Sequence, residues 1–353
     1  MSGLPHVAYF ADPRFSGGTS SAIAAELSVT TSLGKVSFHA AATKMFEGRA
    51  LSPRLDTMLQ QARIDPVWDG KAVSGRVVII HNPSFLKFEK NLEKQIIAKH
   101  IVVVSHENFM RPDGHEAFDV ARCLELIDRN SVAVRKSVAP ISAYNRQTVL
   151  EWDRCFGLPP GWDILPDDWF NICDFPMMAP TPNPRDRRGR HSRPGLEKFP
   201  DTQVLNHCFP PHAEANVILG ADILLADGQS PAHWALHPFR SIDVAQYFDM
   251  IDFMVYFTAP GWRESFGRVL AEGIAAGKVV ITDPGTAATF GDAVISAQPE
   301  DVDDIIATFL ANPPSYTAHV HKAQAKLAEF SPDAFKTRFA ELTGIDATEQ
   351  VAA

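Results

Sequence analysis

Short runs of β-branched and other apolar residues alternate with helix-like segments along this chain of 353 residues. Two of the runs, Arg76–His81 (RVVIIH) and His100–Ser105 (HIVVVS), are apolar at nearly every position. Strands have this composition when helices cover both faces of a parallel sheet, because neither face then meets water. The pattern therefore predicts an α/β fold built on doubly wound parallel sheets.

The strand–helix alternation occurs twice, which predicts two domains. Strand candidates of the first run are His6–Ala11, Lys35–Ala40, Arg76–His81, His100–Ser105 and Ser131–Val138, with helix candidates at Thr19–Leu27, Phe118–Asn130 and Asn145–Trp152. Strand candidates of the second run are Ala215–Leu219, Asp252–Phe257, Lys278–Thr282 and Ala293–Ser296, with helix candidates at Ile242–Met250, Ser265–Ala276, Val302–Leu310 and Ala318–Phe330.

Prolines are dense between about Leu158 and Pro184, where they interrupt both kinds of pattern. Proline fixes φ and lacks a backbone donor, so we expect an irregular connection there, with at most a short helical turn at Asp163–Phe170. The expected division is residues 1–165, residues 166–330, and a C-terminal helix and tail at 331–353 that packs back on the first domain. Ligands of such sheets bind at the carboxyl ends of the strands, so the default site is a central cleft between two Rossmann-like domains.

The overall composition is that of an ordinary water-soluble protein, with 45% hydrophobic and 21% charged residues. No stretch approaches eighteen consecutive apolar residues, and the first residues lack a signal-peptide pattern, so we expect a cytoplasmic protein. The net charge of −9 argues against a general nucleic-acid binder. The four cysteines show no CxxC spacing, which favours buried thiols over disulfides or a zinc site.

The segment from Gly261 to Gly277 carries the clearest chemical signal. It follows a strand candidate, and its apolar residues lie on one face of a helix that we expect to begin near Ser265. A helix start offers free N–H groups to a phosphate, and Gly267 lets the backbone come close to it. Glu264 and Glu272 are eight residues apart, about 12 Å if the stretch is helical, which suits two ends of one extended ligand rather than an acid/base pair.

This segment resembles the E-x7-E donor motif of retaining glycosyltransferases with the GT-B fold, of the group 1 or family-4 type. The resemblance covers Glu264-Ser-Phe-Gly and Leu270-Ala-Glu-Gly-Ile-Ala-Ala-Gly277, followed by a strand. It implies that Glu264 faces the donor sugar and Glu272 the nucleoside ribose, while backbone amides at Ser265, Phe266 and Gly267 hold sugar or phosphate.

Six basic residues between Arg185 and Lys198 form a cluster in an otherwise acidic half of the chain. The resemblance places an Arg and a Lys here to neutralise the departing diphosphate. Arg193 and Lys198 have the usual R-x4-K spacing, with Arg190 as the competing arginine. Phe199 stands where the family usually has Gly, which leaves the register open. An ordinary solvated loop is the alternative reading of such a charge cluster.

Other site candidates follow strand candidates. Gly17 and Gly18 resemble the family's Gly-rich first loop, although a plain turn explains them equally well. His106 follows His100–Ser105 and matches the histidine that touches the donor sugar's primary hydroxyl in related enzymes; His81 is the alternative.

In the second half, His237, Pro238 and Phe239 correspond by resemblance to the loop that reads the base. The loop that begins at Asp283 is expected beside the same cleft, with Asp283 either lining the site or structural.

The implied activity is transfer of a sugar from a nucleotide-diphospho-sugar, UDP- or GDP-linked, with retention of anomeric configuration, as in polysaccharide biosynthesis. Leaving-group charge would be stabilised by Lys198, by Arg190 or Arg193, and by the helix start. No Asp-x-Asp metal motif stands out, so we expect no cofactor and no metal ion. The alternatives are a non-catalytic sugar-nucleotide-binding protein and a same-fold epimerase or phosphorylase. A dehydrogenase is disfavoured because the first loop lacks a dinucleotide fingerprint.

The acceptor is not readable from the sequence, and we expect a glycan, a lipid-linked glycan or a small-molecule hydroxyl. A lipid-linked acceptor would bring the protein to the inner membrane face as a peripheral partner, with Lys87, Lys90, Lys94 and Lys99 near anionic lipid. The same lysines fit an ordinary solvated helix face.

Overall fold

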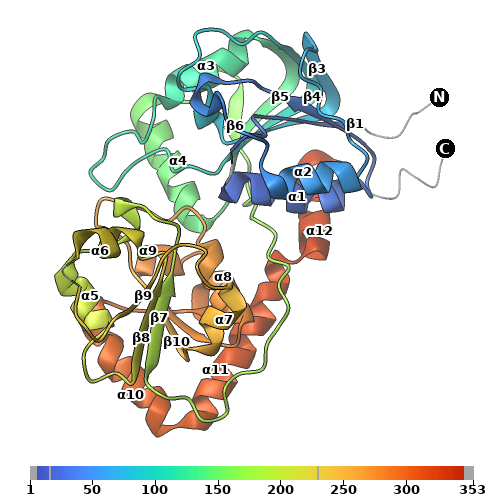
Figure 1. The fold of residues 1–353 in the computed structure, drawn as a ribbon. Helices are drawn as coiled ribbons and strands as arrows, with labels where there is room; N and C mark the ends of the chain where they lie inside the picture. The colour runs from blue at the N-terminus through green and yellow to red at the C-terminus, as the bar shows by residue number, and fades with distance from the viewer. Residues whose placement is uncertain (1–5, 16, 229, 346–353) are drawn as a thin grey trace. The chain divides into compact units, whose positions relative to one another are not determined.

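The computed structural model describes residues 6–15, 17–228 and 230–345, which form two units with separate cores (Figure 1). The N-terminal unit comprises the chain to Ile172 together with the residues from Phe330 on, and the C-terminal unit comprises Cys173–Glu329. The division falls seven residues after the boundary expected at 165, because the segment that follows the last strand of the first sheet still packs with the N-terminal unit.

The N-terminal unit contains a six-stranded parallel sheet in the order β2-β1-β3-β4-β5-β6. Its strands are β1 (His6–Ala11), β2 (Lys35–Ala40), β3 (Ala72–His81), β4 (Gln95–Ser105), β5 (Ser131–Pro140) and β6 (Trp162–Ile164). Its helices are α1 (Gly18–Thr30), α2 (Pro53–Gln61), α3 (Val120–Arg129), α4 (Ala143–Phe156) and α12 (Pro332–Thr343), with the 3-10 turns η1 (Lys44–Phe46) and η2 (Pro83–Leu86).

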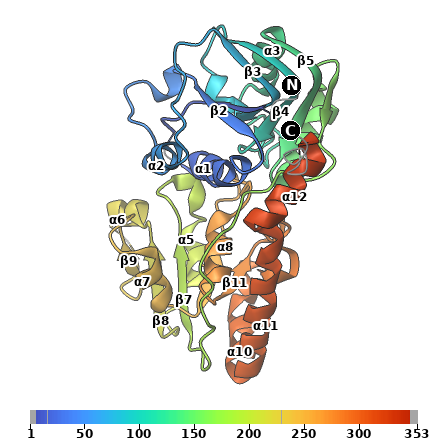
Figure 2. The same ribbon diagram turned by 90° about the vertical axis from the view of Figure 1, so that its right-hand side faces the viewer.

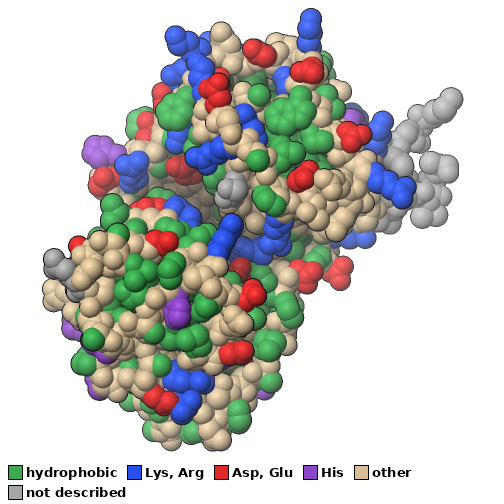
Figure 3. Space-filling view, in the orientation of Figure 1, with side chains coloured by type: hydrophobic (Ala, Val, Ile, Leu, Met, Phe, Trp, Pro, Cys, Tyr) green, Lys and Arg blue, Asp and Glu red, His purple; other side chains and the backbone are tan. Residues whose placement is uncertain are grey.

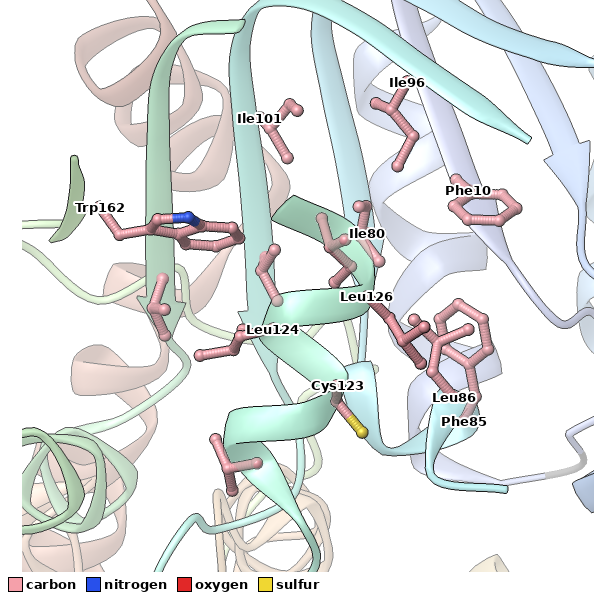
Figure 4. Packing of buried hydrophobic residues seen from close by; sticks show 14 of the residues in the cluster. Phe10, Ile80, Phe85, Leu86, Ile96, Ile101, Cys123, Leu124, Leu126 and Trp162 are labelled. Atoms are coloured by element: carbon pink, nitrogen blue, oxygen red, sulfur yellow. The ribbon is translucent and has the colours of Figure 1, made fainter. Parts of the chain in front are cut away.

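The core of this unit lies on both faces of the sheet, as the near-continuous apolar strands require. On one face, alternate strand residues such as Phe10, Ile80 and Ile101 pack against α3 and η2 (Figure 4). On the other face α1 and α12 contact each other, and Phe335 and Phe339 of α12 meet the ring of Trp169. Segment 165–172 and α12, remote in sequence, therefore complete one layer of the N-terminal unit.

The C-terminal unit also contains a six-stranded parallel sheet, in the order β12-β11-β10-β7-β8-β9. Its strands are β7 (Arg187–His191), β8 (Ala215–Leu219), β9 (Ala235–His237), β10 (Phe253–Tyr256), β11 (Val279–Thr282) and β12 (Ile295–Ser296). Its helices are α5 (Thr202–Cys208), α6 (Asp222–Asp227), α7 (Val244–Asp249), α8 (Arg268–Ala275), α9 (Pro284–Ala287), α10 (Val302–Ala311) and α11 (Pro313–Lys326). Its 3-10 turns are η3 (Leu196–Lys198), η4 (Gly291–Ala293) and η5 (Pro299–Asp301), and η6 (Leu327–Phe330) contains the boundary with the N-terminal unit.

Helices cover both faces of this second sheet as well (Figure 2). On one face, strand residues such as Ile218 and Phe253 pack against α5, α10 and α11. On the other face α8 lies close to the strands at Gly273, where an added Cβ would come within 2.6 Å of Met254. The prediction of an α/β fold with two doubly wound parallel sheets is confirmed.

One expectation for the irregular segment is wrong, and the basic cluster contains a strand that was not predicted. Asp163–Phe170 forms no helical turn; Trp162–Ile164 is instead edge strand β6. The basic cluster contains β7, a central strand that lies between β8 and β10. Its sequence Arg-Arg-Gly-Arg-His has no apolar pattern, so the sequence provided no sign of a strand.

Candidate functional site

The candidate donor site lies at the carboxyl edge of the C-terminal sheet. The strand order places β7 beside β10, and the chain crosses from these two strands to opposite sides of the sheet. Ligands of doubly wound sheets bind at this kind of switch point. The segments that leave it are 192–198 after β7 and 257–267 after β10.

Lys198 and Glu264 meet at this switch point, one from each segment. The Lys198 ammonium donates to Glu264 Oε2 at 2.6 Å, and the Tyr256 hydroxyl donates to the same oxygen at 2.9 Å. The ammonium also lies 4.9 Å from the ring centre of Trp262. Sequence analysis placed Glu264 and Lys198 in one site, and the structure joins them directly.

The environment of Glu264 keeps it ionised. Burial would raise the pKa of its carboxyl, but the Lys198 ammonium, the Tyr256 hydroxyl and the charge of Arg193 lower the pKa below its ordinary value. The carboxylate can therefore accept further hydrogen bonds from ligand hydroxyls at neutral pH. The Glu264 side chain is 16% exposed and that of Lys198 is 9% exposed, so both keep access to a ligand.

Glu272, on α8, is held by the same strand end. Its Oε2 lies 3.0 Å from His191 Nε2 at the end of β7, and its Oε1 lies 3.3 Å from Arg268 Nε. Burial tends to raise the pKa of Glu272, whereas His191 and then Arg268 lower it below its ordinary value. Both glutamates of the E-x7-E segment are thus anchored to residues 191–198 and remain acceptors.

Helix α8 begins at Arg268, three residues later than expected. Gly267 is its N-cap residue, with φ of 82°, a left-handed conformation that excludes helical continuation toward Ser265. No side chain caps this helix start. Phe266 is 4% exposed and its ring contacts Phe290 edge-on, so its side chain belongs to the core and only its backbone can serve the donor site.

Arg190 does not occupy the phosphate-contacting place expected for it. Its side chain is fully buried, its guanidinium stacks 4.2 Å from the ring centre of Phe199 and 5.2 Å from that of Tyr256, and Nη2 donates to the Lys198 carbonyl. Burial lowers its pKa. Phe199, which departs from the family pattern, therefore packs against the Arg190 guanidinium. Arg190 in turn holds the backbone of Lys198 through the hydrogen bond to its carbonyl.

Most of the basic cluster is neutralised inside the protein. Arg187 forms a bidentate pair with Asp252, and Arg188 bonds to Asp186. Arg193 differs, because its side chain is 53% exposed and pairs only with Glu197, at 2.7 Å. Arg185 is also exposed, at 58%, but it precedes β7 and pairs with Glu214. Among the basic residues at the carboxyl end of β7, Lys198 and Arg193 are the two left for an anionic ligand.

Several polar atoms near these strand ends are buried without a hydrogen-bond partner in the described part of the chain. They include Ser192 Oγ, Trp262 Nε1, and Nε and Nη1 of Arg190. An unpaired buried polar group costs about 1–3 kcal/mol. The arrangement around Lys198 thus contains unused hydrogen-bonding capacity.

The predicted base-reading loop follows β9 on the far side of β8. His237 ends that strand, Pro238 follows, and the Phe239 amide donates to Asp222 at 2.8 Å while its side chain is 38% exposed. No described contact joins these three residues to Lys198 or Glu264, so their role stays a prediction. Asp283 accepts the Thr286 amide as the N-cap of α9, a structural role.

The candidates in the N-terminal unit lie at the carboxyl ends of β1, β3 and β4. Gly17 is the N-cap residue of α1, and Gly18 is its first residue. His81 ends β3 and His106 follows β4, and the two rings are hydrogen-bonded, Nδ1 of His81 to Nε2 of His106, at 2.8 Å. The structure brings together two histidines that the sequence presented as alternatives.

The four lysines expected on a helix face do not share one. Residues 82–94 form η2 and a loop, and Lys99 lies in β4. Lys94 is buried and donates to the carbonyls of Trp68 and Gly70. On the face drawn in Figure 3, basic and acidic side chains are interspersed over the N-terminal unit.

Within the described residues, no group of three or more His, Cys, Asp or Glu side chains is placed to hold a metal ion. No helix in that part of the chain is long and apolar enough to cross a membrane.

Sequence reasoning missed three residues of the site: His191, Tyr256 and Trp262. Tyr256 was the last residue but one of a predicted strand and Trp262 lay inside the singled-out segment, so position alone could have nominated both. His191 gave no such signal, because its strand was not recognised.

No protein-family model matches the chain, and no curated protein matches its sequence. Solved structures do match its fold. Anabaena HepE in complex with UDP and glucose has a TM-score of 0.64 and 13% identity, over 96% of this chain and 98% of that one. The lipopolysaccharide outer core galactosyltransferase WaaB, in its apo form, has a TM-score of 0.56 and 12% identity, over 96% and 98%.

A third similar structure is an alpha-glucosyltransferase in complex with UDP-glucose and DNA containing an abasic site. Its TM-score is 0.55 at 12% identity, over 96% of this chain and 99% of that chain. At such identities the likeness shows the fold alone. The chain has the GT-B fold of glycosyltransferases, two Rossmann-like α/β units, as the sequence resemblance implied.

Proposed function

We propose that this protein is a glycosyltransferase that takes a sugar from a nucleotide-diphospho-sugar and transfers it with retention of configuration. The observation that carries the proposal is the hydrogen-bonded group of Lys198, Glu264 and Tyr256 at the β7/β10 switch point. A cation and a carboxylate held together there can bind the diphosphate and the sugar hydroxyls of one ligand.

In this proposal the diphosphate lies against Lys198 and the uncapped start of α8. The ammonium supplies a point charge, and the helix supplies backbone N–H groups and the positive end of its dipole. Arg193 adds a second charge when the ligand displaces Glu197. Together they stabilise the negative charge that develops on the leaving phosphate, which is the main demand of this reaction.

Glu264 and Glu272 bind the two ends of the donor. Glu264 accepts hydrogen bonds from the sugar, and Glu272 accepts them from the ribose. His191 orients the Glu272 carboxylate from behind. Because both pKa values are lowered, neither glutamate holds the proton a general acid needs, and binding is their proposed role.

The nucleotide we propose is UDP, since the HepE and alpha-glucosyltransferase structures with this fold contain UDP or UDP-glucose. The acceptor we propose is a hydroxyl of a glycan, of a lipid-linked glycan or of a small molecule. Transfer needs no metal ion or cofactor, since Lys198 and the helix start supply the positive charge. Activity that persists in excess chelator is the expected result, and its loss would contradict metal independence.

The deciding experiment measures donor binding and turnover together. Thermal shift with UDP and GDP identifies the nucleotide. Slow hydrolysis of the matching nucleotide-sugar is then compared in wild type, Glu264→Ala and Lys198→Ala, with both variants expected to lose turnover. NMR of the released or transferred sugar reads its anomeric configuration. Binding without turnover on any donor or acceptor would establish a non-catalytic binding protein, and a change of the sugar on the nucleotide would establish an epimerase.

A further inference from the structure

A chain of three titratable side chains lies in the N-terminal unit, outside the donor site. Glu26 on α1 is fully buried; its Oε1 accepts the Trp169 indole N–H at 3.0 Å, and its Oε2 lies 3.1 Å from His81 Nε2. His81 Nδ1 lies 2.8 Å from His106 Nε2. The chain runs from a buried carboxyl to a half-buried imidazole at the carboxyl end of β4.

The members of the chain have fixed positions. The His81 ring stacks on Tyr9 with an interplanar angle of 11° and a centroid distance of 5.9 Å. The centroids of the His81 and His106 rings are 5.1 Å apart, as two imidazoles joined edge to edge by a hydrogen bond would be. Glu26 Oε2 and His81 Nε2 have no other partner among the described residues. The contact between these two atoms therefore offsets the free-energy cost of burying them, a cost that an unpaired polar atom would bear in full.

Both imidazoles are neutral rings. Burial lowers the pKa of His81 to about 3, and burial together with the neighbouring His81 lowers the pKa of His106 well below its ordinary value. A neutral imidazole has one N–H, so it donates at one nitrogen and accepts at the other. The hydrogen bonds along the chain must then all run in the same direction.

The ionisation of Glu26 decides that direction. A carboxylate can only accept, so His81 carries its proton on Nε2 and accepts at Nδ1 from the Nε2–H of His106. The free Nδ1 of His106 then holds a lone pair. If Glu26 is protonated, every bond reverses and His106 carries its proton on Nδ1. The two states differ by one proton. When a proton binds His106 Nδ1, the Nε2 proton of His106 crosses to His81 Nδ1 and the Nε2 proton of His81 crosses to Glu26.

We propose that Glu26 and His81 are positioning residues that fix the direction of these hydrogen bonds, so that His106 accepts a hydrogen bond from a substrate hydroxyl while Glu26 is ionised. The proposal rests on the proposed glycosyl transfer and extends it to the N-terminal unit. No hydrogen bond from another described residue reaches His106 Nδ1. His106 lies where a strand ends at the edge at which doubly wound sheets bind ligands. The ligand class is a polyhydroxylated molecule, a sugar, that presents a hydroxyl to this nitrogen.

The proposal predicts a pH-dependent reversal. Burial raises the pKa of Glu26 well above its ordinary value, opposed by the hydrogen bond from Trp169. The other groups that face it are the Tyr9 phenol from β1 and the His81 ring from β3. Beyond Trp169, α12 contributes Phe335 and Phe339, while Arg338 of that helix bonds to the Asp168 carbonyl. As pH falls through the raised pKa of Glu26, His106 changes from acceptor to donor.

Glu26→Gln tests this directly. The Gln carbonyl would accept from Trp169, leaving its NH2 to donate to His81 Nε2, so the reversed direction holds at every pH. The measurement is 15N NMR of the imidazole nitrogens in ring-labelled protein. Above the transition, His106 is expected to carry its proton on Nε2 in wild type and on Nδ1 in Glu26→Gln. His100, whose Nε2 bonds to Ser137 at 2.8 Å in the same sheet, should stay unchanged and serves as internal control.

The same His106 tautomer in both proteins across the pH range would overturn the inference. His81→Phe is the second variant, because a phenyl ring keeps the stack on Tyr9 while it breaks the chain. In this variant His106 should populate both neutral tautomers, while the His100 signals stay where they are in wild type. Persistence of the wild-type His106 signal in His81→Phe would also overturn the proposal.

Kinetics separates this inference from the proposed function. Above the pH of the wild-type transition, nucleotide-diphosphate binding should be unchanged in Glu26→Gln while kcat for transfer or donor hydrolysis falls at least tenfold. A tautomer change without any loss of rate would contradict a role for His106 in substrate binding. Failure of the wild type to bind any nucleotide would instead remove the proposed function, and the NMR result would stand regardless.

Discussion

Glu264 is the residue on which the candidate donor site depends most. Its carboxylate gathers the Lys198 ammonium and the Tyr256 hydroxyl on one oxygen. A buried carboxylate of lowered pKa stabilises the fold only while it is ionised, because protonation removes the attraction to Lys198.

That linkage gives the first prediction. The stabilisation is complete above the ordinary glutamate pKa and is lost as pH falls through the lowered one. Wild type should therefore lose more stability between about pH 6 and about pH 3 than Glu264→Gln does, by roughly 1–2 kcal/mol. Urea unfolding across that range measures it. Parallel stability–pH curves for the two proteins would show that the pair contributes nothing.

The second prediction concerns Arg190 and Arg193, because the sequence could not decide which of them contacts the phosphate. Arg190 is buried between aromatic rings and holds the Lys198 carbonyl, while Arg193 is half exposed. Arg190→Ala should destabilise the protein by about 2–4 kcal/mol through a cavity and a lost stack. Arg193→Ala, the matched control, should leave stability within about 0.5 kcal/mol and weaken nucleotide-diphosphate binding. Thermal unfolding and titration distinguish them; the reverse pattern would place Arg190 at the phosphate.

Among the secondary-structure elements, helix α8 and strand β7 position the residues of the candidate site. The strand looks polar in sequence because its arginines pair with internal carboxylates or stack on rings instead of packing as apolar side chains. The helix begins late because Gly267 adopts a left-handed conformation. Both features shape the edge at which Lys198 and Glu264 meet.

Gly267→Ala supplies the third prediction. Its φ of 82° is strained for any residue with a Cβ, so the change should cost more than about 1 kcal/mol, or shift the start of α8 and weaken donor binding. Gly18→Ala is the matched control. It also lies at a helix start, but an added Cβ there has nothing within 4 Å, so it should be neutral or stabilising by about 0.5 kcal/mol. Denaturant unfolding of both variants makes the comparison. Equal effects at the two glycines would contradict it.

On the scale of the whole molecule, the N-terminal unit is discontinuous in sequence. Its last helix, α12, follows the complete C-terminal unit and packs on Trp169 through Phe335 and Phe339. Two-domain chains of this kind need not unfold in one transition.

The fourth prediction concerns that helix. A chain that ends at Glu329 should expose Trp169 and lower the melting temperature of the N-terminal unit, while UDP still protects the C-terminal unit against heat. A chain that ends at Ile345 is the control and should melt like wild type. Calorimetry with and without nucleotide resolves the two transitions. An unchanged N-terminal transition after loss of α12 would show that the helix is dispensable.

Much of the fold could be predicted because apolar periodicity is a local property. His6–Ala11, Lys35–Ala40 and Ala215–Leu219 form strands with the predicted bounds. The β7 strand could not be predicted, since several partners that make its arginines compatible with a core, such as Asp252, Asp303 and Tyr256, come from distant parts of the chain. The same holds for the start of α8, where a glycine conformation overrides helix periodicity.

Apolar periodicity in the sequence predicted the α/β class, and the resemblance to a known family placed Glu264, Glu272 and Lys198 in one candidate site. Only the tertiary structure decided which cations stay available and which are consumed inside, as the contrast between Arg190 and Arg193 shows. It alone joined Glu26, His81 and His106. The physical reason is that burial and pairing depend on neighbours that the order of strands in a sheet selects, and that order is not written locally in the chain.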